Sequence, residues 1–132
     1  MQNELRKDTA ISRREGGIQA RSYRLGVRIL KLVRAMPRDA GAQVLARQVA
    51  RSGTGVGSNV EEAQAACSKR EFVRKINIAR TEARETHYWL RLIRDAEVMP
   101  TNRLAEIIQE ADEIVAILTA IEKKGRQDDD PA

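Results

Sequence analysis

The 132-residue sequence predicts an all-α protein, an up-down-up-down antiparallel four-helix bundle. Three observations support this fold class. Aromatic residues make up only 3% of the chain, and its apolar residues are chiefly Ala, Ile, Leu and Val in an Arg- and Glu-rich background. Apolar residues recur at alternating spacings of three and four, which places them on one helical stripe. Pro37 and Pro100 divide the chain into three stretches, the long middle one with two apolar stripes, and the short connections between the resulting helices favour antiparallel neighbours.

The first two predicted helices each carry one apolar stripe. The first, about 18–36, ends where Pro37 stops the helical pattern. The second, about 40–66, follows directly after this break. The stripe of the first helix contains Ile18, Ser22, Leu25, Ile29, Leu32 and Met36. The stripe of the second contains Leu45, Val49, Ser52, Val56, Val60 and Ala63.

The third and fourth predicted helices span about 69–97 and 102–124. Ser68, followed three residues later by Glu71, forms the capping-box pattern of a helix start. Thr101 or Asn102 is the predicted N-cap of the last helix, and Gly125 is its predicted end. The two stripes contain Phe72, Ile76, Ala79, Ala83, Thr86, Leu90 and Ile93, and then Leu104, Ile107, Ala111, Ile114, Leu118 and Ile121. The predicted organisation is therefore a flexible segment at 1–17, the bundle at 18–124 and a flexible acidic tail at 125–132.

The net charge of +5 conceals an uneven distribution. Residues 1–100 hold 20 Lys/Arg and 11 Asp/Glu, a net charge of +9, whereas residues 101–132 hold 4 and 8, a net charge of −4. A basic body indicates nucleic acid or another acidic partner. In an oligomer, the acidic last helix of one subunit is also expected to pair with a basic flank of the next.

The sequence offers no catalytic or metal-binding set. One cysteine (Cys67) and one histidine (His87) exclude a disulfide framework, a Cys/His zinc site and the Glu-x-x-His pairs of a di-iron bundle. We therefore predict a protein without enzymatic activity, metal or cofactor. With neither a signal-peptide core nor a membrane-spanning segment in the sequence, we expect a cytoplasmic location. The glycine-rich residues 53–58 lack the P-loop pattern, and we expect them to allow close packing of helices or subunits.

Basic residues gather on two predicted helix faces. At 100° per residue, one face of the third helix lies opposite its apolar stripe, where arginines can contact phosphates and a tyrosine can stack on an unpaired base. A flank of the first helix is also basic. The alternative is that the face of the third helix is an ordinary solvated surface with intrahelical ion pairs. Glu82 and Glu85 are expected to neutralise part of the basic face of the third helix. The candidate nucleic-acid-binding residues are Arg70, Arg74, Arg84, Tyr88 and Arg91 on the third helix, and Arg21, Arg24, Arg28 and Lys31 on the first.

The first predicted helix is apolar over more than one face. Tyr23, Leu30 and Val33 fall on the flank opposite the basic one. Because the bundle itself needs only the stripe, this second apolar flank predicts burial against another subunit.

The middle of the sequence carries a family pattern. Residues 48–52 (QVARS) are followed by Val56, by Asn59 with Glu62, by residues 68–72 (SKREF) and by Glu85. Over about 36–93 this resembles the four-helix-bundle family of proteins encoded by intervening sequences in bacterial 23S rRNA genes. Gly55, Ala63 and residues 80–81 depart from the family pattern, which has Ser, Gly and Gly-Ser there.

The resemblance implies a homo-oligomer, a ring of five subunits, without known enzymatic activity. Related accessory variability determinants of diversity-generating retroelements form basic rings that bind nucleic acid and a reverse transcriptase. Two functions are therefore carried forward: binding of RNA or other nucleic acid, and, as the alternative, a scaffold for a protein partner such as a reverse transcriptase. Asn59 and Glu62 are either a ligand-binding pair or part of a hydrogen-bond network between helices. The family-motif residues are Asn59, Glu62, Glu71, Phe72 and Glu85.

Overall fold

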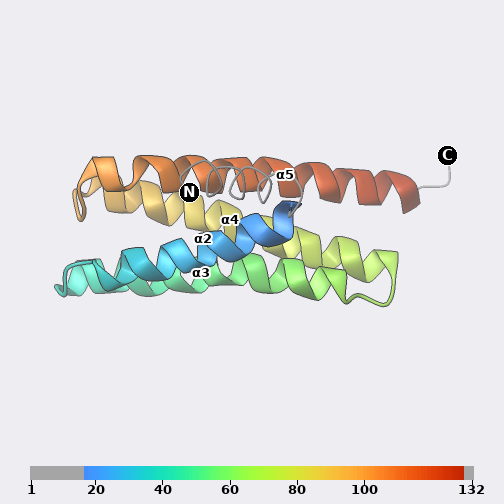
Figure 1. Cartoon of the computed structure of the whole chain (residues 1–132), viewed down its shortest axis with the longest axis horizontal. Coiled ribbons are helices and arrows are strands. Elements are labelled where there is room, and N and C mark those ends of the chain that lie inside the picture. Colours follow the sequence, from blue (N-terminus) through green and yellow to red (C-terminus); the bar gives the residue numbers. More distant parts are fainter. Residues whose placement is uncertain (1–16, 130–132) are drawn as a thin grey trace, which may run out of the picture.

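The computed structural model describes residues 17–129, which form four long helices and one short turn of 3-10 helix (Figure 1). No strand occurs within this range. The elements are α2 (Gly17–Arg34), α3 (Ala40–Gln64), α4 (Lys69–Asp95), η1 (Thr101–Arg103) and α5 (Ala105–Asp129). The predicted all-α four-helix bundle is confirmed.

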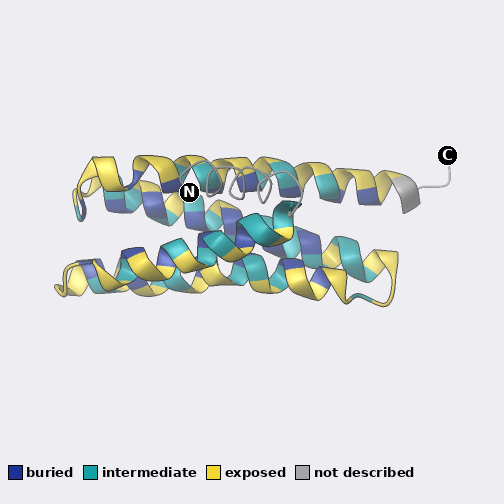
Figure 2. Cartoon of the chain, viewed as in Figure 1, coloured by how far each residue is buried: buried dark blue, intermediate teal, exposed yellow. Residues whose placement is uncertain are grey.

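The helices pack in a closed order in which α2 contacts α3, α3 contacts α4, α4 contacts α5, and α5 returns to α2. The pairs α4–α5 and α2–α3 form two layers along the long axis of the molecule (Figure 1). The predicted stripes face inward, and buried residues recur on the inner side of each helix (Figure 2). Of the predicted stripe residues, Ile18, Leu45, Phe72 and Ile121 are partly buried at the edge of the core, and the rest are buried.

Side-chain caps fix where α3 and α4 begin. The Ala42 amide donates to Asp39 Oδ1 at 3.0 Å, and the Glu71 amide donates to Ser68 Oγ at 3.1 Å. The Glu71 carboxylate in turn accepts from the Cys67 amide at 3.4 Å. The predicted helix start after Ser68 is thus confirmed. The Ser68 hydroxyl and the Glu71 carboxylate accept hydrogen bonds from backbone amides that have no partner within the helix.

α4 ends in a Schellman motif with an unusual residue. The Val98 amide donates to the Ile93 carbonyl at 3.0 Å, and the Glu97 amide donates to the Arg94 carbonyl at 3.0 Å. Glu97 occupies the left-handed position with φ of 57°. Glycine is favoured there because a Cβ in this conformation crowds the backbone.

We therefore expect Glu97→Gly to raise the free energy of unfolding by about 1 kcal/mol, since it relieves the left-handed strain. The measurement is urea denaturation of both proteins. Glu97→Ala serves as the control, because it removes the same carboxylate and keeps the Cβ. A gain in Glu97→Ala equal to that in Glu97→Gly would contradict the backbone explanation.

The last helix differs from its predicted bounds at both ends. It begins at Ala105, after the 3-10 turn Thr101–Arg103, and the predicted N-caps Thr101 and Asn102 belong to that turn. It continues through Gly125 to Asp129, so residues 125–129 of the predicted flexible tail are helical. Gly125 is buried, and a Cβ there would lie 2.6 Å from Val73 Cγ2. This glycine therefore permits close contact with α4 instead of ending the helix. Residues 1–16 of the predicted flexible segment, and 130–132 of the tail, lie outside the described residues; Gly17 begins α2.

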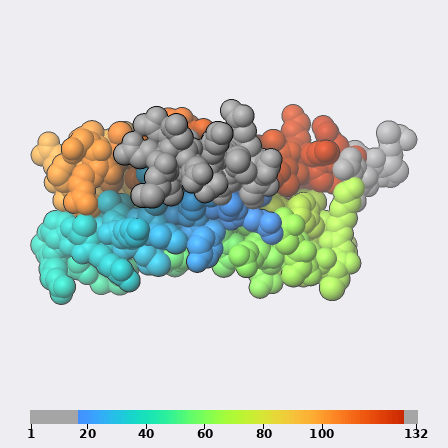
Figure 3. Space-filling model, viewed as in Figure 1, coloured from blue at the N-terminus to red at the C-terminus, as the bar shows by residue number. Residues whose placement is uncertain are grey.

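Two glycines of residues 53–58, Gly53 and Gly57, bring α3 close to α2 as predicted, whereas Gly55 faces Glu82 of α4. A Cβ on Gly53 would lie 2.8 Å from Ile29 Cγ1, and one on Gly57 would lie 3.2 Å from the Ser22 carbonyl oxygen. Figure 3 shows α2 lying directly against α3 on this face of the molecule. The glycines thus serve packing within one chain.

Candidate nucleic-acid interface

The outer face of α4 carries the predicted basic stripe. Arg70, Arg74, Arg84, Tyr88 and Arg91, hereafter the α4 stripe, are all exposed. Within residues 17–129, none of its four arginines forms an ion pair with a carboxylate. The Arg91 guanidinium lies over the Tyr88 ring, 5.8 Å from its centroid. Unpaired guanidinium groups on one helix face remain available to bind anions.

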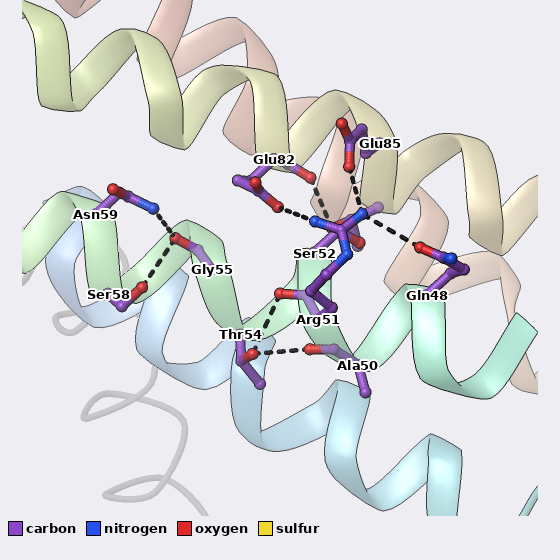
Figure 4. A network of polar contacts seen from close by, with 11 residues as sticks. Gln48, Ala50, Arg51, Ser52, Thr54, Gly55, Ser58, Asn59, Glu82 and Glu85 are labelled. Atoms are coloured by element: carbon purple, nitrogen blue, oxygen red, sulfur yellow. Dashed lines mark hydrogen bonds and ion pairs between the residues drawn. The ribbon is translucent and has the colours of Figure 1, made fainter.

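Glu82 and Glu85, expected to neutralise part of the α4 stripe, are bound to α3 instead. Arg51 reaches across from α3 and lies 3.4 Å from Glu82 Oε2 and 2.8 Å from Glu85 Oε2 (Figure 4). Arg51 also donates to Gln48 Oε1 at 3.3 Å. Burial, and then the neighbouring charge of Glu85, raise the pKa of Glu82, and Arg51 opposes this shift. This network therefore removes two carboxylates from the stripe.

Sequence reasoning did not identify Arg51 as the partner of these acids. The sequence did hold a signal for a basic partner, because Glu82 and Glu85 are three residues apart and therefore lie on one edge of α4. The helix that faces that edge can be known only once the bundle order is known.

The basic flank of α2 is largely paired with α5 of the same chain. Arg21 forms a two-pronged pair with Glu110, with Nε 3.2 Å from Oε2, and lies 3.6 Å from Glu113. Arg28 lies 3.8 Å from Glu106. The hydrogen bond to Glu110 holds the pKa of Arg21 above its usual range.

Acidic and basic helices thus pair within one subunit, whereas the sequence predicted this pairing between neighbouring subunits. The side chain of Arg21 is only 13% exposed, so this candidate has little surface left for a phosphate. Arg24 and Arg28 are half-buried, and Lys31 is exposed.

The motif residues Asn59 and Glu62 do not form the expected network between helices. Asn59 Nδ2 donates to the Gly55 carbonyl of its own helix at 2.8 Å (Figure 4). The Glu62 side chain is exposed and makes no hydrogen bond or ion pair within the described part of the chain. The other motif residues have structural contacts: Glu71 supports the α4 cap, Phe72 packs at the edge of the core and Glu85 binds Arg51.

The second apolar flank of α2 is present with one change. Tyr23 is 67% exposed and Leu30 44%, whereas Val33 is partly buried against the core, so its place in a subunit interface stays a prediction. At 100° per residue, Val33 lies only about 60° from the centre of the buried stripe. Val27, 38% exposed, joins Tyr23 and Leu30 on the exposed part of the flank.

These three side chains border a groove of about 370 Å³ between α2 and α3. Gly26 and Gly57 also line it, so the groove is bounded by small residues and flanked by apolar ones. We call this surface the α2–α3 groove.

The described residues contain no group of three or more His, Cys, Asp or Glu side chains placed to hold a metal ion. Within the same range, no helix is long and apolar enough to cross a membrane.

Comparison with known proteins identifies similar sequences and structures. The family model of the 23S rRNA-intervening sequence protein matches residues 14–120. A crystal structure from Bacteroides thetaiotaomicron is similar to this chain, with 34% sequence identity and a TM-score of 0.76 over 81% of this chain and 99% of that one. It is described as a protein with unknown function from the S23 ribosomal protein family. No curated protein matches the chain. Neither description names an enzymatic activity.

Proposed function

Because the chain belongs to the 23S rRNA-intervening sequence protein family, we propose that it is a non-enzymatic, cytoplasmic protein that binds RNA or other nucleic acid through the α4 stripe. The observation that carries the proposal is the contrast between the two basic faces. On α2, Arg21 and Arg28 are bound to carboxylates of α5, whereas the four arginines of the α4 stripe pair with no carboxylate within residues 17–129.

The charge balance of α4 supports a polyanionic partner. Its acids at 82 and 85 are directed to Arg51, which leaves the arginines and Tyr88 together on the outer face. Arginines on such a face bind phosphates, and release of counterions from the nucleic acid drives this binding. An exposed aromatic ring among them adds a stacking surface for bases.

We expect loss of the α4 stripe to weaken nucleic-acid binding by about tenfold or more and to flatten its salt dependence, since each phosphate contact contributes about 0.7 to 0.9 to the salt slope. The variant carries Arg→Ala at positions 70, 74, 84 and 91. Fluorescence anisotropy against structured rRNA fragments and single strands, at about 50 mM salt, gives the affinities.

The matched control carries Arg→Ala at four exposed positions off the stripe: Arg34, Arg38, Arg47 and Arg103. Both variants lose the same charge, so only a local interface separates them. Equal loss in the two would contradict the α4 stripe, and no binding by the parent protein would end the proposal. A protein partner captured from the native host that survives nuclease treatment would favour the scaffold function instead.

We also propose that the protein self-associates through the α2–α3 groove, as a ring of five. Exposed Tyr23, Val27 and Leu30 lie on successive turns, and Gly26 between them leaves room for a helix to approach. An exposed apolar surface of this kind is typical of subunit interfaces.

Light scattering is expected to give a mass near 74 kDa for five 14.8 kDa chains, and Leu30→Arg to reduce it toward that of one chain because it places a charge in the interface. Val44→Arg is the control, since Val44 is 50% exposed on α3 and does not line the groove. A parent mass of 14.8 kDa at micromolar concentration would contradict self-association.

A further inference from the structure

A second groove adjoins the α4 stripe, between α4 and α5. It has a volume of about 390 Å³, at the lower end of the range of ligand sites. Its lining combines cations, an aromatic ring, an imidazole and two carboxylates from two helices, and one of the carboxylates, Glu85, is already bound to Arg51. The residues are Arg84, Glu85, His87, Tyr88, Arg91, Asp112 and Val115.

The aromatic side of this groove suits stacking. Tyr88 is 48% exposed, and its ring is held by neighbours on the same helix. Trp89 meets it edge-on with centroids 5.1 Å apart, and the Arg91 guanidinium lies 5.8 Å from its centroid. A ring that is both exposed and restrained offers a base a stacking partner at low entropic cost.

The α5 side offers a hydrogen-bond acceptor. Asp112 is exposed and forms no ion pair within residues 17–129. His87 lines the same groove, and its pKa is lowered first by burial and then by Arg91 and Arg94, while Asp112 opposes the shift. The lowered pKa favours the uncharged imidazole, which does not compete as a cation for the Asp112 carboxylate.

A carboxylate has two oxygens that accept side by side. On an unpaired base the Watson–Crick edge is accessible, and guanine alone presents two adjacent donor groups there, the ring N1–H and the exocyclic amine. In a duplex both this edge and the ring faces are covered, so a base must be unpaired to use the groove.

We propose that the α4–α5 groove binds one unpaired guanine of a single-stranded nucleic acid. The base stacks on Tyr88, its Watson–Crick edge meets Asp112, and Arg84 and Arg91 hold the flanking phosphates. This inference rests on the proposed nucleic-acid binding and adds a strand form and a base preference to it.

The probes are a short labelled oligouridylate, the same strand with one uridine replaced by guanosine, the deoxy version of the latter, and a duplex of equal charge. The guanine strand is expected to bind about tenfold more tightly than oligouridylate at the same salt, in line with one stacked and hydrogen-bonded base. A similar affinity of the deoxy strand would mean that the groove reads the base and not the ribose.

Two intrinsic reporters lie at the groove. Trp89 and His87 are the only tryptophan and histidine of the chain. Only the guanine strands are expected to quench the Trp89 fluorescence and shift the His87 ring resonances, because a base at Tyr88 approaches both side chains.

Variants separate this geometry from simple charge attraction. Tyr88→Leu should lower single-strand affinity about tenfold, and Tyr88→Phe should retain it because the ring remains. Asp112→Asn removes a negative charge, so charge attraction alone predicts tighter binding of every strand, whereas our proposal predicts weaker binding of the guanine strand only. Arg47→Ala, which removes an exposed cation of α3 outside the groove, should leave the guanine preference unchanged.

Equal affinity for the strands with and without guanine, or unchanged binding by Tyr88→Leu, would overturn the groove assignment while leaving the α4 stripe in place. If the duplex binds as well as the single strands, the strand preference is wrong. If no strand binds at low salt, the proposed function fails, and this inference fails with it.

Discussion

Gly53→Ala is expected to lower the free energy of unfolding by about 1–3 kcal/mol, the usual cost of adding a methyl group to a filled core. A Cβ at this position would lie 2.8 Å from Ile29 Cγ1 and 2.9 Å from Ile29 Cγ2. Ile29 is fully buried, and a β-branched side chain in a helix has one strongly preferred χ1 rotamer. It therefore has no alternative rotamer that clears the added methyl group, and α2 and α3 must separate.

Gly41→Ala is the matched control on the same helix. Its Cβ would lie 3.5 Å from Asp39 Oδ1, which is ordinary van der Waals contact. This change should raise the free energy of unfolding by up to about 1 kcal/mol, the difference in helix propensity between glycine and alanine. The same change at two glycines of α3 is thus expected to have opposite effects on stability.

The measurement is urea denaturation at one fixed protein concentration, because self-association would otherwise add to the apparent stability. In an Ile29→Ala background, Gly53→Ala should cost clearly less, since the two Cγ atoms are gone. An unchanged cost in that background would show that Ile29 is not the cause.

The sequence was sufficient to predict the core, because burial along a helix is a local, periodic property. Val49, Val56 and Val60 on α3, and Ala79, Ala83 and Leu90 on α4, are all buried as their spacing predicts. The helix starts after Asp39 and Ser68 were also recognisable from local features.

Features that depend on contacts between helices could not be predicted in this way. Gly125 looks like a helix end, but its contact with Val73 makes it an interior packing residue. Arg21 was assigned correctly to a basic flank, yet its pairing with Glu110 follows from the adjacency of α2 and α5.

The charged residues of the candidate site show the same difference between what local sequence predicts and what contacts between helices decide. The acidic last quarter of the chain was visible in the sequence, but its effect is to bind Arg21 and Arg28 within the same chain. The arginines that remain unpaired on α4 are therefore a better guide to an interface than the total of 24 Lys/Arg.

The one polar contact deep in the described core joins α3 to α4. Ser52 and Thr86 are both fully buried, and their hydroxyl oxygens form a hydrogen bond of 2.9 Å. Thr86 Oγ1 is also within 2.8 Å of the Glu82 carbonyl, one turn earlier in its own helix. Both residues lie at stripe positions that apolar side chains otherwise occupy.

Thr86→Val keeps the shape of the side chain and removes its hydroxyl. We expect it to lower the free energy of unfolding by about 1–2 kcal/mol, because Ser52 Oγ stays buried without its partner. Ser52→Ala should cost less, since Thr86 retains the Glu82 carbonyl as an acceptor. The two single variants are therefore expected to differ, although they break the same bond.

The double variant Ser52→Ala/Thr86→Val should be about as stable as the parent protein, because no buried hydroxyl then lacks a partner and both sites remain filled. The coupling in a double-mutant cycle is then expected to equal the sum of the two single costs, about 2 kcal/mol, measured by urea denaturation at fixed protein concentration. If the costs of the two single changes simply add, each hydroxyl contributes independently and the contact is not a coupled pair. If the double variant is instead as stable as the parent, the polar contact adds little net stability. The contact then fixes the register of α3 against α4, because any arrangement that buries one hydroxyl alone is penalised.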